Sequence, residues 1–409
     1  MKQLLIIGYV WPEPNSSAAG SRMMQLITFF QQQNYQITFA SPAQRTEHMV
    51  ELSDFQVNCV DIKLNCPSFD EFAQQLQPDV VMFDRFMMEE QFGWRISEQC
   101  PQALKVLDTE DLFCLRHARH HAYKQQRTMT DADLLSSDLA QREVAAIFRC
   151  DLSLMISPKE ITLLEKLFKV DASLLHFCPL LYSQGDFSLD NPNFVQRDGF
   201  ISIGNFRHAP NWDAVLWLKQ HIWPLIRAQL PQAQLNVYGA YPPPKATALH
   251  DEKSGFLVKG WVDDAILAMQ SARVCLAPLR FGAGIKGKLA EAMLCATPSV
   301  TTDIGIEGMD SELAWPGRVA NNAQAFADAA VQLYKETNTW QKLSDLGPKN
   351  ARLLFEQNKH FALLAARLTE ISSTLLMHRQ QNFIGAMLNH HHHKSTKYMA
   401  QWIEAKNKL

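Results

Sequence analysis

The chain contains two successive runs of short apolar segments that alternate with longer helical patterns. The first run has apolar segments at 4–8, 35–40, 57–62, 79–83, 104–108 and 152–157. The second run has them at 200–204, 233–239, 256–260, 273–279 and 298–302. Buried strands that alternate with helices are typical of parallel sheets in α/β domains. The pattern therefore predicts two Rossmann-like, doubly wound domains, and ligands in such folds bind at the carboxyl ends of the strands.

A polar stretch separates the two runs. Apolar periodicity vanishes between residues 183 and 199, where turn-forming residues gather. The chain has 409 residues, which exceeds the length at which a single core usually keeps growing. We therefore expect a first domain over 1–185, a second domain over 198–360, and C-terminal helices over 361–409 that can pack back on the first domain.

The composition is that of an ordinary soluble enzyme. Hydrophobic residues make up 47% of the chain and the net charge is -3, so no general basic field is available for nucleic acid. The eight cysteines form no C-x-x-C pair, which is typical of free thiols in a reducing compartment. Residues 1–8 are too short for a signal peptide, and no run reaches the roughly 18 apolar residues of a membrane span. These features predict a cytoplasmic protein.

The stretch 280-RFGAGIKGKLAEAMLCATPSV-300 joins a strand to a helix through three glycines. Glycines let a backbone approach a ligand closely, and the amides at a helix start favour an anion. The stretch thus predicts a diphosphate site made by Gly282, Ala283, Gly284, Ile285, Lys286 and Lys288. Taken alone, however, such a pattern more often marks a tight turn with solvated lysines.

The rest of the sequence favours the diphosphate site over the tight turn. The segments 203-IGNFRHAPNWDAVLWL-218, 260-GWVDD-264 and 282–309, together with a strand that ends at Tyr238-Gly239, resemble glycosyltransferase family 4 in their order along the chain. The resemblance covers the whole second domain and is looser in the first. It implies the GT-B fold, in which two Rossmann-like domains face each other across a cleft, with C-terminal helices.

The resemblance also implies an activity. Members of the family transfer a sugar from a nucleotide diphosphate, here UDP- or GDP-linked, to an acceptor hydroxyl with retention of configuration, and they use no metal or cofactor. The acceptor is a glycan, a lipid-linked molecule or a protein. The family carboxylate that binds the donor ribose corresponds to Glu291, and the basic residues at the diphosphate correspond to Lys286 or Lys288. On the opposite side of the phosphates, the resemblance points to Gly204, Asn205 and Arg207.

The chain departs from the family pattern at one position. The usual glutamate pair places its first member eight residues before the second, and here that position is Ala283. In most members the first glutamate lies near the donor sugar. The departure therefore implies altered sugar recognition. It also leaves open a protein that binds sugar nucleotides without turnover.

The first domain is expected to bind the acceptor. Asp84 and Arg85 follow one strand, and the loop 8–22 offers the hydroxyl of Ser17 and the flexible Gly20 before the first helix. Catalytic candidates are Asp111, beyond a strand, and His117, on the following helical stretch. For any single histidine, a surface or capping role is more common than catalysis.

Other functions remain as alternatives or are disfavoured. A GT-B nucleotide-sugar epimerase would use the same diphosphate site without an acceptor. A dehydrogenase is disfavoured because the glycine that follows Gly8 is Gly20, which breaks the dinucleotide fingerprint. The run His390–His393 lacks a carboxylate one turn away, so we predict no metal site. Tyr398 and Trp402, among lysines of the tail, allow peripheral contact at the inner face of a membrane.

Overall fold

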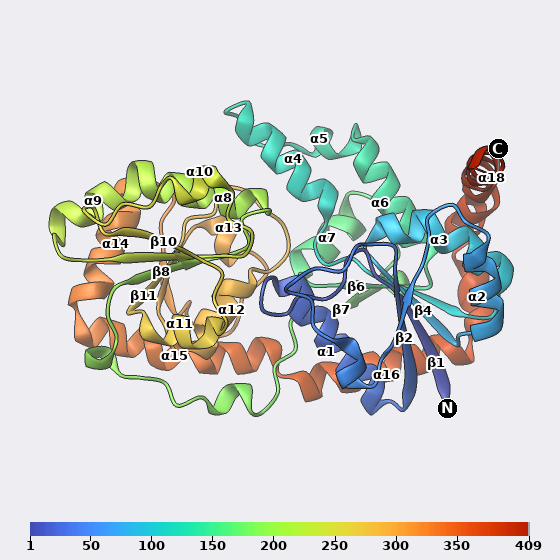
Figure 1. Cartoon of the computed structure of the whole chain (residues 1–409), viewed down its shortest axis with the longest axis horizontal. Coiled ribbons are helices and arrows are strands. Elements are labelled where there is room, and N and C mark those ends of the chain that lie inside the picture. The colour runs from blue at the N-terminus through green and yellow to red at the C-terminus, as the bar shows by residue number, and fades with distance from the viewer. Residues whose placement is uncertain (408–409) are drawn as a thin grey trace.

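The chain folds into two parallel α/β domains that lie side by side (Figure 1). The computed structural model describes residues 1–407, apart from the side chains of residues 391–395. The first sheet has the strand order β3-β2-β1-β4-β5-β6-β7, and the second has the order β10-β9-β8-β11-β12-β13. All strand pairs in both sheets are parallel. The predicted fold class, two doubly wound α/β domains, is confirmed.

The strands of the first sheet are β1 (Lys2–Ile7), β2 (Tyr35–Ser41), β3 (Asn58–Asp61), β4 (Val80–Asp84), β5 (Leu104–Asp108), β6 (Leu152–Met155) and β7 (Leu175–Phe177). The helices around it are α1 (Ala18–Gln32), α2 (Ser68–Leu76), α3 (Phe86–Gln99), α4 (Phe113–Lys124), α5 (Asp131–Leu135), α6 (Asp138–Arg149) and α7 (Pro158–Lys166). Helices cover both faces of the sheet, which explains why its strands are apolar on both sides. Within β1, for example, Leu4 and Ile6 enter one core while Leu5 and Ile7 enter the other.

The strands of the second sheet are β8 (Phe200–Ile203), β9 (Leu235–Tyr238), β10 (Phe256–Gly260), β11 (Val274–Ala277), β12 (Ser299–Thr301) and β13 (Gly317–Val319). Its helices are α8 (Ala209–Trp217), α9 (Trp223–Gln229), α10 (Pro244–Thr247), α11 (Ala265–Ser271), α12 (Gly287–Leu294), α13 (Asp303–Ile306) and α14 (Ala323–Lys335). A π-helical turn (Leu218–Ile222) joins α8 to α9. The helical segment between β8 and β9 therefore consists of three connected pieces.

The C-terminal helices are α15 (Thr337–Phe355), α16 (Gln357–Ser373), α17 (Leu375–Gln381) and α18 (Phe383–Asn407). Helix α15 packs against α12 of the second domain, and α16 then runs along the first domain (Figure 1). Phe361 and Leu364 of α16 belong to the same core as Leu4 and Ile6 of β1. Helix α18 contacts α3 and α6, so the chain ends on the domain where it began.

The two connections between the domains lie side by side. The amide of Tyr182 donates to the carbonyl of Phe355 at 2.8 Å, and the amide of Gln357 donates to the carbonyl of Tyr182 at 2.9 Å. The outgoing and returning segments are therefore hydrogen-bonded where they cross. No described helix combines the length and the apolar character that crossing a bilayer requires.

Candidate active site

The start of α12 and the start of α8 meet beside the end of β8. The ammonium of Lys288 donates to Oδ1 of Asn211 at 2.8 Å, and Nδ2 of Asn211 donates to the carbonyl of Asn205 at 3.0 Å. Gly204 lies under this contact, and a Cβ atom there would sit 2.7 Å from Nζ of Lys288 and 2.6 Å from Nδ2 of Asn211. Only glycine leaves room for this approach. A lysine and an amide side chain are thus held at the carboxyl edge of the second sheet.

Glu291 lies one turn after Lys288 on α12. Burial raises the pKa of the Glu291 carboxyl to about 7, although Lys288 acts in the opposite direction. Burial lowers the pKa of the Lys288 ammonium to about 8. Both groups therefore titrate close to neutral pH, which is a feature of functional sites more than of exposed surface.

The loop that precedes α12 is engaged by the first domain. The amide of Gly284 donates to Oε1 of Glu160 on α7 at 2.7 Å, and the carbonyl of Gly282 accepts from Nη1 of Arg119 on α4 at 2.8 Å. The ammonium of Lys286 donates to the carbonyls of Ala283, at 3.1 Å, and Gly284. The expectation that this loop presents free amides is therefore wrong at Gly284, whose amide is already occupied by a carboxyl oxygen.

The remaining donor-side candidates take different positions. Nδ2 of Asn205 donates across the domain boundary to the carbonyl of Ser16 at 3.4 Å. Arg207 is exposed, and its guanidinium lies 3.5 Å from the centre of the Tyr241 ring. Ile285 is buried in an apolar cluster with Leu180, so its side chain packs instead of facing a ligand.

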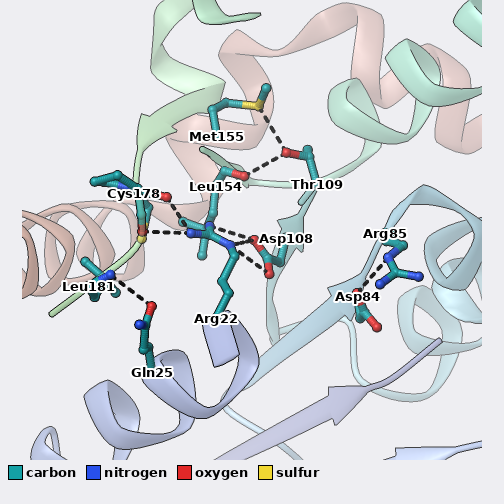
Figure 2. A network of polar contacts seen from close by, with 11 residues as sticks. Arg22, Gln25, Asp84, Arg85, Asp108, Thr109, Leu154, Met155, Cys178 and Leu181 are labelled. Atoms are coloured by element: carbon teal, nitrogen blue, oxygen red, sulfur yellow. Dashed lines mark hydrogen bonds and ion pairs between the residues drawn. The ribbon is translucent and has the colours of Figure 1, made fainter. Parts of the chain in front are cut away.

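Asp84 and Arg85 lie where β4 ends, as the sequence predicted. Figure 2 shows Arg85 close to Asp84, with Nε 3.4 Å from Oδ1 of the carboxylate. The other carboxylate oxygen accepts from the amide of Tyr9 at 3.0 Å, and the guanidinium of Arg85 lies 5.1 Å from the centre of the Tyr9 ring. Arg85 and Glu110 both have left-handed φ angles, of 70° and 63°. Such backbone strain in non-glycine residues clusters at functional sites.

Arg22 and Asp108 form a buried ion pair in the first domain. Nη2 of Arg22 lies 2.8 Å from Oδ1 of Asp108, and neither side chain is exposed. Nη1 of Arg22 donates to the carbonyls of Cys178 and Pro179, at 2.6 and 2.9 Å. Figure 2 shows how this guanidinium ties α1 to the ends of β5 and β7. The pair therefore sets the position of the strand ends at the domain boundary.

Helix α4 brings other residues to the boundary than the sequence indicated. His117 is exposed on this helix, whereas the His120 ring stacks on Phe281 of the second domain with a centroid distance of 4.3 Å. Asp111 is paired with Arg116, with Nε 2.8 Å from Oδ2. Asp111 also packs against the glycine loop, because a Cβ atom on Gly284 would lie 2.9 Å from Cβ of Asp111. The structure thus brings Asp111, but not His117, into contact with the loop 282–286 that precedes α12, which we call the donor-side loop.

Ser17 and Gly20 have local structural roles. Oγ of Ser17 accepts from the amide of Gly20 at 3.0 Å and caps α1. A Cβ atom on Gly20 would lie 2.3 Å from the backbone of Glu13, so glycine is required for this turn. Both residues shape the loop, and the Ser17 hydroxyl is engaged in this cap.

Sequence reasoning missed several residues that line the boundary. His208 precedes α8, and burial, with Arg116 nearby, lowers its pKa to about 4. Asn211, Glu160, Arg119 and Glu307 were also not singled out. His208 and Asn211 belong to the stretch 203–218 that carried the family resemblance, which was the available signal. No sequence signal indicated Glu160 or Arg119, because the residues that they contact, Gly284 and Gly282, lie far away in the sequence.

Metal-ligating residues do not gather in the part of the chain whose side chains are described. No group of three histidine, cysteine, aspartate or glutamate side chains there is placed to hold an ion. The run His390–His393 falls largely outside that part, because the side chains of 391–395 are not described.

Two parallel α/β domains with facing strand ends, followed by helices that return to the first domain, form the GT-B fold of glycosyltransferases. Residues 197–336 match the family model described as "Glycosyl transferases group 1". This segment contains Gly204, Asn211, Lys288 and Glu291. No curated protein shows a significant match to the chain.

Solved structures share the whole fold at low sequence identity. Sucrose-phosphate synthase from Thermosynechococcus elongatus is 16% identical, with a TM-score of 0.65 over 91% of this chain and 100% of that chain. HepE from Anabaena, solved in complex with UDP, is 14% identical, with a TM-score of 0.64 over 90% and 100% of the two chains. A TarM variant from S. aureus, in complex with fondaparinux, alpha-GlcNAc-glycerol and UDP, is 9% identical, with a TM-score of 0.68 over 90% and 99%.

Proposed function

We propose that this chain is a glycosyltransferase that moves a hexose from a nucleotide diphosphate sugar to an acceptor hydroxyl in glycan or polysaccharide biosynthesis. The observation that carries the proposal is the junction of Gly204, Asn211 and Lys288, one turn before Glu291. It lies in the segment that matches the glycosyltransferase model and at the strand edge where α/β folds bind ligands. UDP and GDP are the proposed donor nucleotides, and HepE and TarM were solved with UDP.

The geometry suggests a role for each donor-side group. The Glu291 carboxylate accepts hydrogen bonds from the ribose hydroxyls. The Lys288 ammonium, with the amides at the start of α12, stabilises the negative charge that develops on the departing diphosphate. Lys286 hydrogen-bonds its own loop in this structure, so it must release the carbonyls of Ala283 and Gly284 to reach a phosphate.

Retention of configuration and independence of metal ions belong to the same proposal. With cationic side chains at the diphosphate, the leaving group needs no divalent cation to balance its charge. The leaving phosphate oxygen then takes the proton of the acceptor hydroxyl as the new bond forms on the same face. Activity that survives chelation with EDTA, and a product whose anomeric configuration by NMR equals that of the donor, would support these two points.

A panel of UDP- and GDP-linked hexoses tests the proposal. We expect nucleoside diphosphate release that depends on an added acceptor mixture and falls by about a hundredfold in Glu291→Ala, which loses two hydrogen bonds from ribose hydroxyls to a charged group. Glu312→Ala is the matched control, because Glu312 is an exposed glutamate of the same domain. Equal release by wild type and Glu291→Ala would refute the proposal. Conversion of the donor without any acceptor would instead identify an epimerase.

The acceptor side of the proposal rests on the strand ends of the first domain. Asp84, Arg85 and Tyr9 form a group of polar and aromatic atoms there, which suits a glycan acceptor. We also propose that α18 contacts the inner face of a membrane that carries lipid-linked acceptor. Tyr398 and Trp402 of this helix are 64% and 60% exposed, and such aromatic side chains bind at lipid interfaces. Cosedimentation with anionic liposomes that is unchanged in Tyr398→Ser/Trp402→Ser would refute the membrane contact.

A further inference from the structure

Glu160 reaches from the first domain into the donor-side loop of the second. It lies in the first turn of α7 and is 1% exposed. Its Oε1 atom accepts two amides at once, from Leu112 at 3.1 Å in its own domain and from Gly284 at 2.7 Å across the boundary. One carboxyl oxygen therefore joins the start of α4 to the glycine loop.

The other carboxyl oxygen has no such partner. Oε2 of Glu160 is buried and makes no hydrogen bond in the structure. Leaving a buried polar atom unsatisfied costs about 1–3 kcal/mol, so such an atom in a native site calls for an explanation. Burial, with Asp111 nearby, raises the pKa of the Glu160 carboxyl to about 8, although Lys286 acts in the opposite direction. Near neutral pH the group can therefore either donate or accept a hydrogen bond.

The surroundings indicate what kind of ligand atom would meet this oxygen. Ala283, the residue before Gly284, contributes no polar side-chain atom to the loop. Asp111, a carboxylate that interacts electrostatically with Glu160, is held by Arg116. A hydroxyl group satisfies a carboxyl oxygen without bringing a charge into a buried site. In a nucleotide sugar both the ribose and the transferred sugar carry uncharged hydroxyls, and the proposed function already assigns the ribose hydroxyls to Glu291, which leaves those of the transferred sugar.

We propose that Glu160 hydrogen-bonds a hydroxyl group of the transferred sugar and is thereby a specificity-determining residue supplied by the domain opposite to the nucleotide. This inference rests on the proposed function and names a group that selects the sugar. It follows that sugar selection requires the closed arrangement of the domains, because the Glu160 carboxyl meets the Gly284 loop only when the two domains touch.

A second glutamate of the first domain provides a matched control. Glu143 is also buried and also accepts amides at the start of α4, from Phe113 at 2.9 Å and from Cys114 at 2.7 Å. Both of its carboxyl oxygens are occupied, and both partners belong to its own domain. Substitution of Glu143 therefore reports the cost of weakening the start of α4 without touching the donor side.

The test compares binding of UDP with UDP-glucose, and of GDP with GDP-mannose, by calorimetry in wild type, Glu160→Ala, Glu160→Gln and Glu143→Gln. Loss of one hydrogen bond corresponds to about tenfold in affinity. We expect Glu160→Ala to weaken the nucleotide sugar about tenfold and to leave the diphosphate within about twofold. Glu160→Gln keeps an oxygen that can accept the amides of Leu112 and Gly284, so it allows the inference to be tested if Glu160→Ala fails to fold.

Deoxy-sugar analogues of the donor locate the hydroxyl. Wild type should discriminate against the analogue that lacks the bound hydroxyl, and Glu160→Gln should lose part of that discrimination while Glu143→Gln retains it. Equal weakening of diphosphate and nucleotide sugar, or no change in the deoxy-sugar preference, would overturn the inference and leave the proposed function intact. Wild type that binds neither kind of ligand would overturn both.

Discussion

The guanidinium of Arg119 holds the carboxylate of Glu307 across the domain boundary, with Nη1 2.6 Å from Oε2 and Nη2 2.7 Å from Oε1. Arg119 comes from α4 of the first domain, and Glu307 follows α13 of the second. Burial acts to raise the pKa of Glu307, but Arg119 and Lys286 outweigh it and hold the pKa below its usual value. The pair, together with the contact of Glu160 with Gly284, fastens the domains on the two sides of the donor-side loop.

Removing this pair should weaken domain closure. Bidentate pairs of this kind are stronger than single contacts, but both side chains are partly exposed, so we expect a contribution of about 1 kcal/mol. Arg119→Gln and Glu307→Gln should each lower kcat/KM about fivefold, and the double variant should be little worse than either. Kinetics at low and high ionic strength check this, because screening by salt should shrink the coupling. Independent, additive effects would contradict a shared contact.

A small residue lies at another point of the boundary. A Cβ atom on Gly287, the first residue of α12, would lie 2.6 Å from Cβ of Ala18, the first residue of α1. Gly287→Ala should therefore wedge the domains apart without harming α12, because alanine favours helices. Overpacking costs about 1–3 kcal/mol, so kcat/KM should fall about tenfold or more.

The same contact offers a rescue. Ala18→Gly removes the opposing methyl group, so the double variant Gly287→Ala/Ala18→Gly should recover most of the lost kcat/KM. Small-angle scattering should show a larger radius of gyration for Gly287→Ala than for the double variant. Activity lost equally in both would mean that the glycine is required for a reason other than space.

The buried pair of Arg22 and Asp108 should dominate the stability of the first domain. Arg22→Met leaves the Asp108 carboxylate buried without its cation, and breaking such a pair typically costs about 3–5 kcal/mol. Urea denaturation monitored by circular dichroism measures the free energy of unfolding. Arg142→Met removes a more exposed ion pair with Glu90 and should change the free energy of unfolding by less than about 1 kcal/mol. Similar losses in both variants would show that burial of the Arg22 pair is unimportant.

Much of the fold could be predicted from sequence because most strands of the two sheets are buried on two faces. Segments such as 104–108 and 273–279 are mainly apolar, and they contain β5 and β11. The missed strands are β7 and β13, which have only three residues each, so they carry no periodicity. Helices α5 and α6 are separate because Ser137 caps α6 by accepting the amide of Ala140.

The site could be predicted only where its residues are close in sequence. Lys288 and Glu291 are one helical turn apart, so spacing and family resemblance placed them together. The contact of Glu160 with Gly284 joins residues 124 positions apart. The position of Glu160 is set by how two separately folded domains meet, and local patterns carry no information about that. The same limit applies to His117, because helical spacing alone does not show which face of α4 meets Phe281.

The titration of Glu291 and Lys288 predicts how donor binding depends on pH. The pKa of the Glu291 carboxyl is raised to about 7 by burial, so the carboxylate that accepts ribose hydroxyls forms as pH rises through about 7. The pKa of the Lys288 ammonium is lowered to about 8 by burial, so its positive charge is lost as pH rises through about 8. The affinity for UDP or GDP should therefore be greatest between about pH 7 and 8 and fall on both sides.

Two variants show which residue causes the fall in affinity on each side of the pH maximum. Glu291→Gln cannot ionise, so the fall below about pH 7 should flatten while the fall above about pH 8 remains. Lys288→Met lacks one of the two ammonium groups, and burial also lowers the pKa of the remaining one, Lys286, to about 8. The affinity of this variant should therefore be weak already at pH 7 and should decline less than that of wild type above pH 8. Calorimetry across this range measures both. A wild-type affinity that keeps rising above pH 8 would show that Lys288 does not act as the diphosphate's cation, because deprotonation would then carry no penalty.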